Sequence, residues 1–94
     1  MYKINKNKKL RVIPLNDPIY VWTTYDLGVS TALLCAGFEL LSLNRSNPRK
    51  VLFIFRREEK IDKTANAYFA DQLKLNARSY FDQLKALKNR LYSE

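Results

Sequence analysis

Two short apolar segments joined by a basic turn constrain the fold of this chain more than any other feature of its sequence. Residues 38–43 and 51–55 are apolar and rich in β-forming side chains. Residues 44–48 between them, Asn-Arg-Ser-Asn-Pro, consist mainly of turn formers. This pattern predicts an antiparallel β-hairpin.

The second strand of this hairpin is apolar on both faces. Side chains alternate along a strand, so one side receives Val51, Phe53 and Phe55 and the other receives Leu52 and Ile54. One face can pack against helices, whereas the other then needs a second cover or a ligand. What the aromatic face meets therefore becomes the question of function.

The remaining patterns predict one more strand and three helices. β-Branched and aromatic residues predict a strand over 19–25, and a helix over 27–36 has an aspartate before it and a glycine after it. Apolar residues at helical spacing predict helices over 58–71 and 77–92. The order β-α-β-β-α-α indicates the α+β class, with a mainly antiparallel sheet of three or four strands and helices packed on one face. Strands one and two either pair in parallel or have strand three between them, as in the split βαβ of ferredoxin-like and RNA-recognition folds.

The length of 94 residues allows one domain. We expect this domain to span 18–94 and to follow a flexible basic arm over 1–17, in which residues 10–15 can form an edge strand. No apolar stretch approaches the roughly 20 residues of a membrane span. The basic N-terminus is followed by no secretion signal. These features predict a cytoplasmic protein that does not bind membranes.

The residue types that most enzymes and metal sites need are scarce. The chain has no histidine and one cysteine, Cys35, and its nine Asp and Glu residues are scattered. Zinc sites and activated nucleophiles need clusters of such side chains. The two glycines, Gly28 and Gly37, bracket a helix and form no phosphate-binding loop. We therefore expect a non-catalytic protein without a metal or a cofactor.

Basic residues outnumber acidic ones by 17 to nine, which leaves a net charge of +8. Such an excess attracts polyanions, and nucleic acid is the commonest polyanion of a cytosol. The cations gather in two places. The arm carries Lys3, Lys6, Lys8, Lys9 and Arg11, and the hairpin and its edges carry Arg45, Arg49, Lys50, Arg56 and Arg57.

Aromatic residues on the expected sheet face complete a candidate site for nucleic acid. The candidates for stacking are Tyr20, Trp22, Phe53 and Phe55. Rings on an open sheet stack on unpaired bases, while Lys and Arg hold the phosphates. The pattern thus predicts binding of single-stranded DNA or RNA, with non-specific affinity added by the arm. The other interpretation of Phe53 and Phe55 is burial, under the last helix or a second copy of the chain.

Two further functions remain open at this point. The hairpin tip and the arm could grip duplex phosphates without contacting bases, which predicts a steep salt dependence and no preference for single strands. Alternatively, an exposed apolar face could form a homodimer or dock on a larger protein, as in an accessory protein of a phage or mobile element.

Two resemblances add context. Residues 49–55, Arg-Lys-Val-Leu-Phe-Ile-Phe, resemble the basic and aromatic third strand of an RNA-recognition motif, but they lack its glycine, and a helix stands where that domain has a fourth strand. The segments W-T-T-Y-D-L, A-L-L-C-A-G-F-E-L-L, R-S-N-P-R-K-V-L-F-I-F and A-R-S-Y-F-D-Q-L-K-A-L-K-N-R-L-Y resemble a family of small, functionally uncharacterised domains from bacterial and phage genomes. This resemblance implies no established activity and no site residues. A phage or mobile-element setting would favour nucleic-acid transactions or modulation of host machinery.

Overall fold

A computed structural model describes residues 12–93 and confirms the α+β class and the order β-α-β-β-α-α. The elements are β1 (Val21–Thr24), α1 (Leu27–Cys35), β2 (Leu40–Asn44), β3 (Leu52–Arg56), α2 (Ile61–Phe69) and α3 (Ala77–Ser93). Helix α2 begins later than predicted, because residues 58–60 form a turn in which the Ile61 amide donates to the Glu58 carbonyl at 3.2 Å.

The sheet has the strand order β1-β3-β2, and β3 is antiparallel to both neighbours. Strands β1 and β2 are therefore parallel but not adjacent, which is the split βαβ arrangement. The described residues form three strands, and the expected edge strand over 10–15 is wrong for its described part, because residues 12–15 are not a strand. The β2–β3 register shifts between Leu40 and Ser42.

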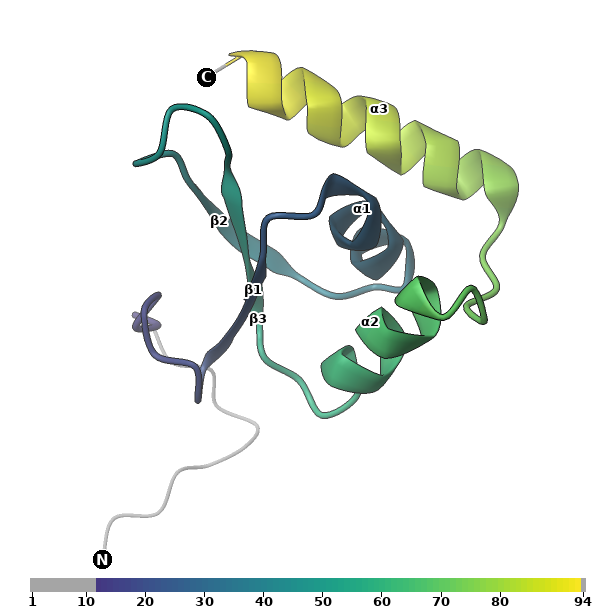
Figure 1. Cartoon of the computed structure of the whole chain (residues 1–94), viewed down its shortest axis with the longest axis horizontal. Coiled ribbons are helices and arrows are strands. Elements are labelled where there is room, and N and C mark those ends of the chain that lie inside the picture. The colour runs from purple at the N-terminus through teal and green to yellow at the C-terminus, as the bar shows by residue number, and fades with distance from the viewer. Residues whose placement is uncertain (1–11, 94) are drawn as a thin grey trace, which may run out of the picture.

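All three helices lie on one side of the sheet, as predicted (Figure 1). The central strand contributes Phe53 and Phe55 to this side, and their exposed fractions are 2% and 0%. The other members of the core cluster come from the helices: Val29, Leu33, Ile61, Ala65 and Leu87. The hydrophobic core thus sits between β3 and the helix layer, and the burial of these apolar groups is the main source of stability.

The opposite side of the sheet faces the chain that leads into β1 (Figure 1). A hollow of about 270 Å³ on this side is lined by Leu15 and Pro18 together with Val21 and Ile54 of the sheet. Val21 and Ile54 are buried. The Arg57 side chain holds this segment, because its Nε donates to the Pro18 carbonyl at 2.8 Å. The second apolar face of β3 is therefore partly covered by the chain itself.

Both ends of α1 carry capping residues of the types that helix ends favour. Asp26 is the N-cap, since its carboxylate accepts from the Val29 amide at 2.7 Å. At the other end Gly37 adopts a φ of 98°, and the Phe38 amide donates to the Leu33 carbonyl at 3.0 Å. This is a Schellman motif, which requires a residue that tolerates positive φ. The aspartate before this helix and the glycine after it in the sequence are thus its N-cap and its C-terminal stop.

Candidate functional site

Phe53 and Phe55 lie inside the protein, so the interpretation of these two rings as buried is confirmed and they form no open stacking face. Phe53 and Phe55 belong to the core cluster. Trp22 is half-buried and packs edge-on against Phe55, with ring centroids 6.3 Å apart, while its indole Nε1 donates to Asp62 at 2.9 Å. Helices cover these rings because β3 directs its two phenylalanines, rather than Leu52 and Ile54, to the helix side. The resemblance of residues 49–55 to an RNA-recognition strand therefore does not extend to exposed rings.

Two of the predicted phosphate-binding cations are engaged elsewhere. Arg56 pairs with Glu39 at 2.9 Å. Arg57 pairs with Asp62 at 2.8 Å and also donates to the Pro18 carbonyl. Both guanidinium groups thus connect neighbouring segments next to β3, and each has a carboxylate that would repel a phosphate.

The last of the predicted aromatic residues is Tyr20. It lies in a turn before β1 and is half-buried.

The remaining hairpin cations belong to the turn between β2 and β3. This turn lies beside the C-terminal end of α3 (Figure 1). Arg45 joins the two segments, because its Nη1 donates to the Leu91 carbonyl at 3.1 Å and its Nη2 to the Arg90 carbonyl at 3.3 Å. A cation at this position also opposes the negative end of the helix dipole. The hairpin turn is therefore fixed next to a helix that is far away in sequence.

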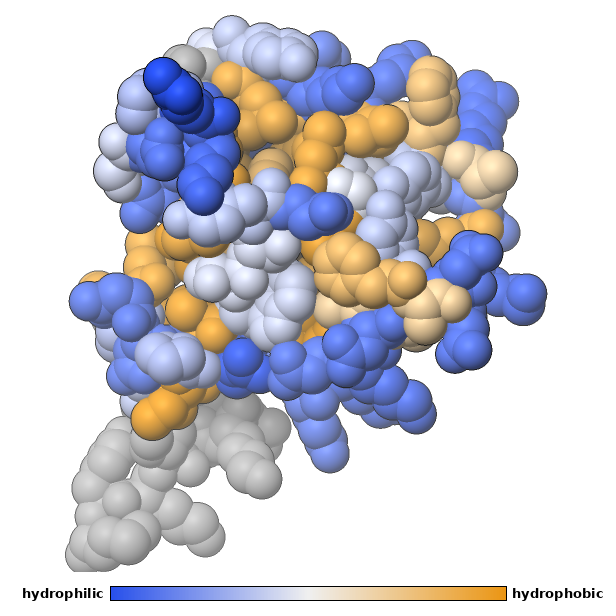
Figure 2. All heavy atoms as spheres, in the orientation of Figure 1, coloured by the Kyte–Doolittle hydropathy of each residue, from blue (hydrophilic) through white to orange (hydrophobic). Residues whose placement is uncertain are grey.

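A hollow of about 330 Å³ opens between these segments, and we call it the hairpin–helix groove. Its lining residues are Tyr25, Leu27, Arg45, Pro48, Arg49, Lys50, Val51, Phe53, Leu91 and Tyr92. Figure 2 shows apolar residues at the surface between the hairpin and α3, with hydrophilic residues over the hairpin tip. The groove thus combines an apolar floor with a cationic rim.

The segments that form the groove carry an excess of positive charge. Residues 40–57 and 83–93 contain no aspartate or glutamate, and Glu94 next to them lies outside the described residues. The third segment, residues 25–27, contains Asp26, whose carboxylate accepts from the Val29 amide as the N-cap of α1. Both cations of the hairpin tip, Arg49 and Lys50, are exposed. Among the groove-lining residues none is acidic. The described lining therefore carries three cations and no carboxylate, and these charges favour an anionic ligand.

Two exposed tyrosines border the groove, and neither was among the predicted site residues. Tyr25 is 53% exposed and Tyr92 is 81% exposed. The Lys50 ammonium lies 4.2 Å from the centroid of the Tyr25 ring. The sequence could have indicated that Tyr92 is exposed. It directly follows Leu91 of the apolar stripe of the last helix, so its side chain points away from that stripe. Tyr25 carries no comparable signal, because its contact with Lys50 joins residues 25 positions apart.

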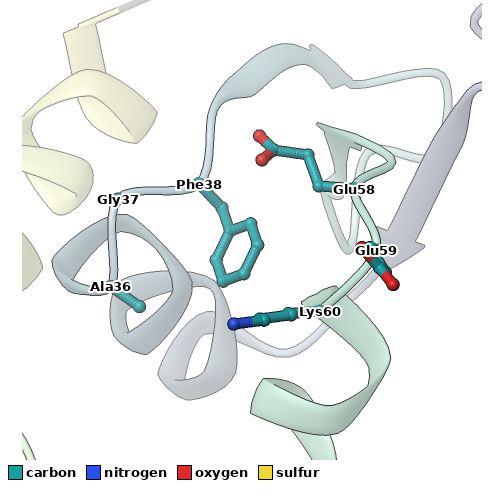
Figure 3. Close-up of a pocket in the computed structure, with 6 residues that line it drawn as sticks. All are labelled: Ala36, Gly37, Phe38, Glu58, Glu59 and Lys60. Atoms are coloured by element: carbon teal, nitrogen blue, oxygen red, sulfur yellow. The ribbon is translucent and has the colours of Figure 1, made fainter. Parts of the chain in front are cut away.

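Another hollow lies where α1 ends and α2 begins, and Figure 3 shows its lining. Glu58 and Glu59 are neighbours there, but their carboxylates point in different directions (Figure 3). They therefore do not form a pair of carboxylates that could act together as general acid and general base. At a further hollow, Cys35 is half-buried beside Lys74 and Ser79, and burial raises the pKa of its thiol. That shift makes the thiol less reactive.

The part of the chain between residues 12 and 93 contains no group of three Cys, Asp or Glu side chains placed to hold a metal ion. Within the same residues no helix is long and apolar enough to cross a membrane. The predicted arm cations Lys3, Lys6, Lys8, Lys9 and Arg11 lie outside the described residues.

Comparison with protein families gives a match over most of the chain. Residues 20–93 match the model of DUF5659, a domain of unknown function. No curated protein and no solved structure shows significant similarity to the chain. The match confirms the expected membership of an uncharacterised family of small domains, and it assigns no residue a role.

Proposed function

The chain belongs to the DUF5659 family, and from its own groove we propose that this member is a non-catalytic nucleic-acid-binding protein. The observation that carries the proposal is the hairpin–helix groove, which Arg49 and Lys50 line together with two exposed tyrosines, and whose described lining includes no acidic residue. Phosphates bind where cations are exposed and not already neutralised by carboxylates. Arg49 and Lys50 meet that condition, whereas Arg56 and Arg57 do not.

The proposed interface differs from the one expected from the sequence. Phe53 and Phe55 are buried and Tyr20 and Trp22 are half-buried, so the proposed contacts with the ligand lie at the hairpin turn, the segment before α1 and the last turn of α3. The net charge of +8 supports long-range attraction of a polyanion. The arm cations add non-specific affinity in this proposal. No cofactor or metal takes part.

The absence of catalysis is part of the proposal and has its own support. The chain has no histidine, so its serine and tyrosine hydroxyls have no imidazole base. Burial and contact with Tyr68 raise the pKa of Tyr80 to about 12, which keeps this hydroxyl protonated near neutral pH. Neither feature favours an activated nucleophile.

The proposal is tested by fluorescence anisotropy with the double variant Arg49→Ala/Lys50→Ala and labelled single-stranded and duplex oligonucleotides. We expect weaker binding to every sequence and a salt slope that falls by about 0.7 for each lost contact with a single strand. The matched control is Lys63→Ala/Lys74→Ala, which removes the same charge from exposed positions outside the groove. This control should retain more of the affinity.

Equal losses in the two double variants would show that net charge, and not the groove, determines binding. If the wild-type chain binds neither single strands nor duplex at low salt, nucleic-acid binding is refuted. The mass of the protein in solution, recorded in parallel, then tests the alternative of a homodimer, and a pull-down tests a protein-docking module.

A further inference from the structure

We infer that the hairpin–helix groove accepts an unpaired base, so that this chain binds single strands in preference to duplex. This inference rests on the proposed function and adds to it the part of the nucleic acid that enters the groove. It also moves the stacking residues from the sheet, where the sequence placed them, to Tyr25 and Tyr92. Three properties of the groove support it.

The first property is the chemistry of the floor. Leu27, Val51 and Leu91 are half-buried and apolar, and all three line the groove. Phosphate groups gain nothing from such a surface, whereas the faces of a base are apolar enough to bury against it. A purely electrostatic site for duplex phosphates would need only the rim. The floor therefore indicates that something other than phosphate enters.

The second property is the size of the groove. Its volume of about 330 Å³ lies at the lower end of ligand pockets, which span about 300 to 1,000 Å³. Such a space suits one planar base, with the sugar-phosphate backbone of the nucleic acid outside the groove. In a duplex the faces of the bases are covered by their neighbours, so only an unpaired base can present a face to the groove.

The third property is the placement of rings and cations around the same space. Tyr25 precedes α1 and Tyr92 lies in the last turn of α3, so two segments from distant parts of the chain each supply an exposed ring. Stacking on aromatic side chains tolerates every base. Arg49 and Lys50 stand on the rim, where they can hold the phosphates on either side of the bound nucleotide.

Lys50 links the contact with a base to the contact with a phosphate. Its ammonium lies 4.2 Å from the centroid of the Tyr25 ring and so occupies one face of that ring. A phosphate on the rim attracts the ammonium more strongly than the ring does, because the phosphate carries a full charge. Movement of Lys50 to the phosphate would free this face of Tyr25 for a base.

The test compares three ligands of equal length, about 12 nucleotides: a single-stranded oligothymidine, the same backbone without bases, and a duplex. We expect the wild-type chain to bind the oligothymidine about tenfold more tightly than the base-free backbone. Tyr92→Ala should remove most of this difference, whereas Tyr92→Phe should retain it, because a phenyl ring still stacks.

The matched control is Phe81→Ala. Phe81 is 55% exposed on α3 and, like Tyr25, has a lysine ammonium near its ring, Lys85 at 5.2 Å, but it does not line the groove. This variant should retain the full preference. Circular dichroism checks that each variant is folded.

The outcomes separate this inference from the proposed function. If the wild-type chain binds all three ligands equally and Arg49→Ala/Lys50→Ala weakens each, the groove holds phosphates alone, and only the inference is overturned. If base preference exists but Tyr92→Ala and Tyr25→Ala both retain it, the base lies elsewhere and the inference is also overturned. Absence of binding to every ligand refutes both.

Discussion

Gly28 illustrates how a single residue can be required for a reason that local propensity does not show. On propensity alone a glycine in the first turn of a helix costs about 1 kcal/mol relative to alanine. In the structure the Tyr68 hydroxyl lies so close to Gly28 that a Cβ at this position would overlap it, and the Tyr68 Cζ would lie 3.2 Å away. Tyr80 adds a bond from its hydroxyl to the Gly28 carbonyl at 3.2 Å. The glycine therefore permits α2 and α3 to approach α1.

Helix propensity predicts that Gly28→Ala stabilises the protein, whereas the close contact with Tyr68 predicts that it destabilises the protein. We expect it to lower the free energy of unfolding by about 1 to 3 kcal/mol, the usual cost of overpacking. Chemical denaturation with linear extrapolation measures this change. A stabilised Gly28→Ala variant would contradict the close packing of Tyr68 on α1.

The control for this prediction is a double-mutant cycle with Tyr68→Phe. Removal of the hydroxyl removes the closest atom, so Gly28→Ala should cost less in the Tyr68→Phe background than in the wild type. Additive effects would show that the cost arises elsewhere, for instance at the Asp26 carboxylate, 3.2 Å from the same Cβ position.

The arginines of the hairpin show where sequence reasoning at the residue scale ends. Their clustering was predictable, and Arg49 and Lys50 do lie on the rim of the groove. The role of each one depends on partners far away in sequence, however. Arg45 bonds to residues 45 and 46 positions later, and Arg56 pairs with a glutamate 17 positions earlier. No local pattern distinguishes an arginine that binds a helix end from one that is available to a ligand.

The same limit applies to β3 at the scale of the elements. The hairpin, the helix caps and the element order followed from local patterns of alternation, turn formers and helical spacing. Which face of β3 would receive the helices did not, because the strand is apolar on both faces. In the structure the neighbouring strands favour the phenylalanine face. Trp22 of β1 pairs with Phe55, and Leu43 of β2 pairs with Phe53. Both neighbours add apolar side chains on the helix side of the sheet.

The joint between the hairpin and α3 is the element-scale contact on which the groove depends. Arg45→Ala removes two hydrogen bonds to helix carbonyls and a favourable charge at the helix C-terminus. We expect the free energy of unfolding to fall by about 1 to 2 kcal/mol. Amide hydrogen exchange should show the loss of protection concentrated in the last turns of α3.

Two substitutions control this prediction. Arg45→Lys should restore little of the stability, because an ammonium cannot reproduce the two-pronged geometry of the guanidinium. Arg49→Ala removes the same charge from an exposed position of the hairpin turn and should leave stability nearly unchanged. Uniform loss of protection in Arg45→Ala, spread over all helices, would show that Arg45 contributes to general stability and not to this joint.

At the scale of the whole molecule, positive charge is divided between the body and the N-terminal residues. Residues 1–11 contain Lys3, Lys6, Lys8, Lys9 and Arg11 and no acidic residue, so they carry more than half of the net charge of +8. Among residues 12–93, by contrast, the buried members of the core cluster are Val29 and later residues. Charge and core are thus supplied largely by different parts of the chain.

This division predicts the effect of replacing all five of these cations by glutamine in the full-length chain. Affinity should fall for single strands and duplex by the same factor, and the salt slope should fall with it, because these cations supply only electrostatic attraction. The ratio between single strands and duplex should stay constant, since it arises in the groove, and the melting temperature should change little. Anisotropy at several salt concentrations and thermal denaturation measure these quantities. A reduced ratio would mean that residues 1–11 also contact bases, and the groove would then be only one part of the interface.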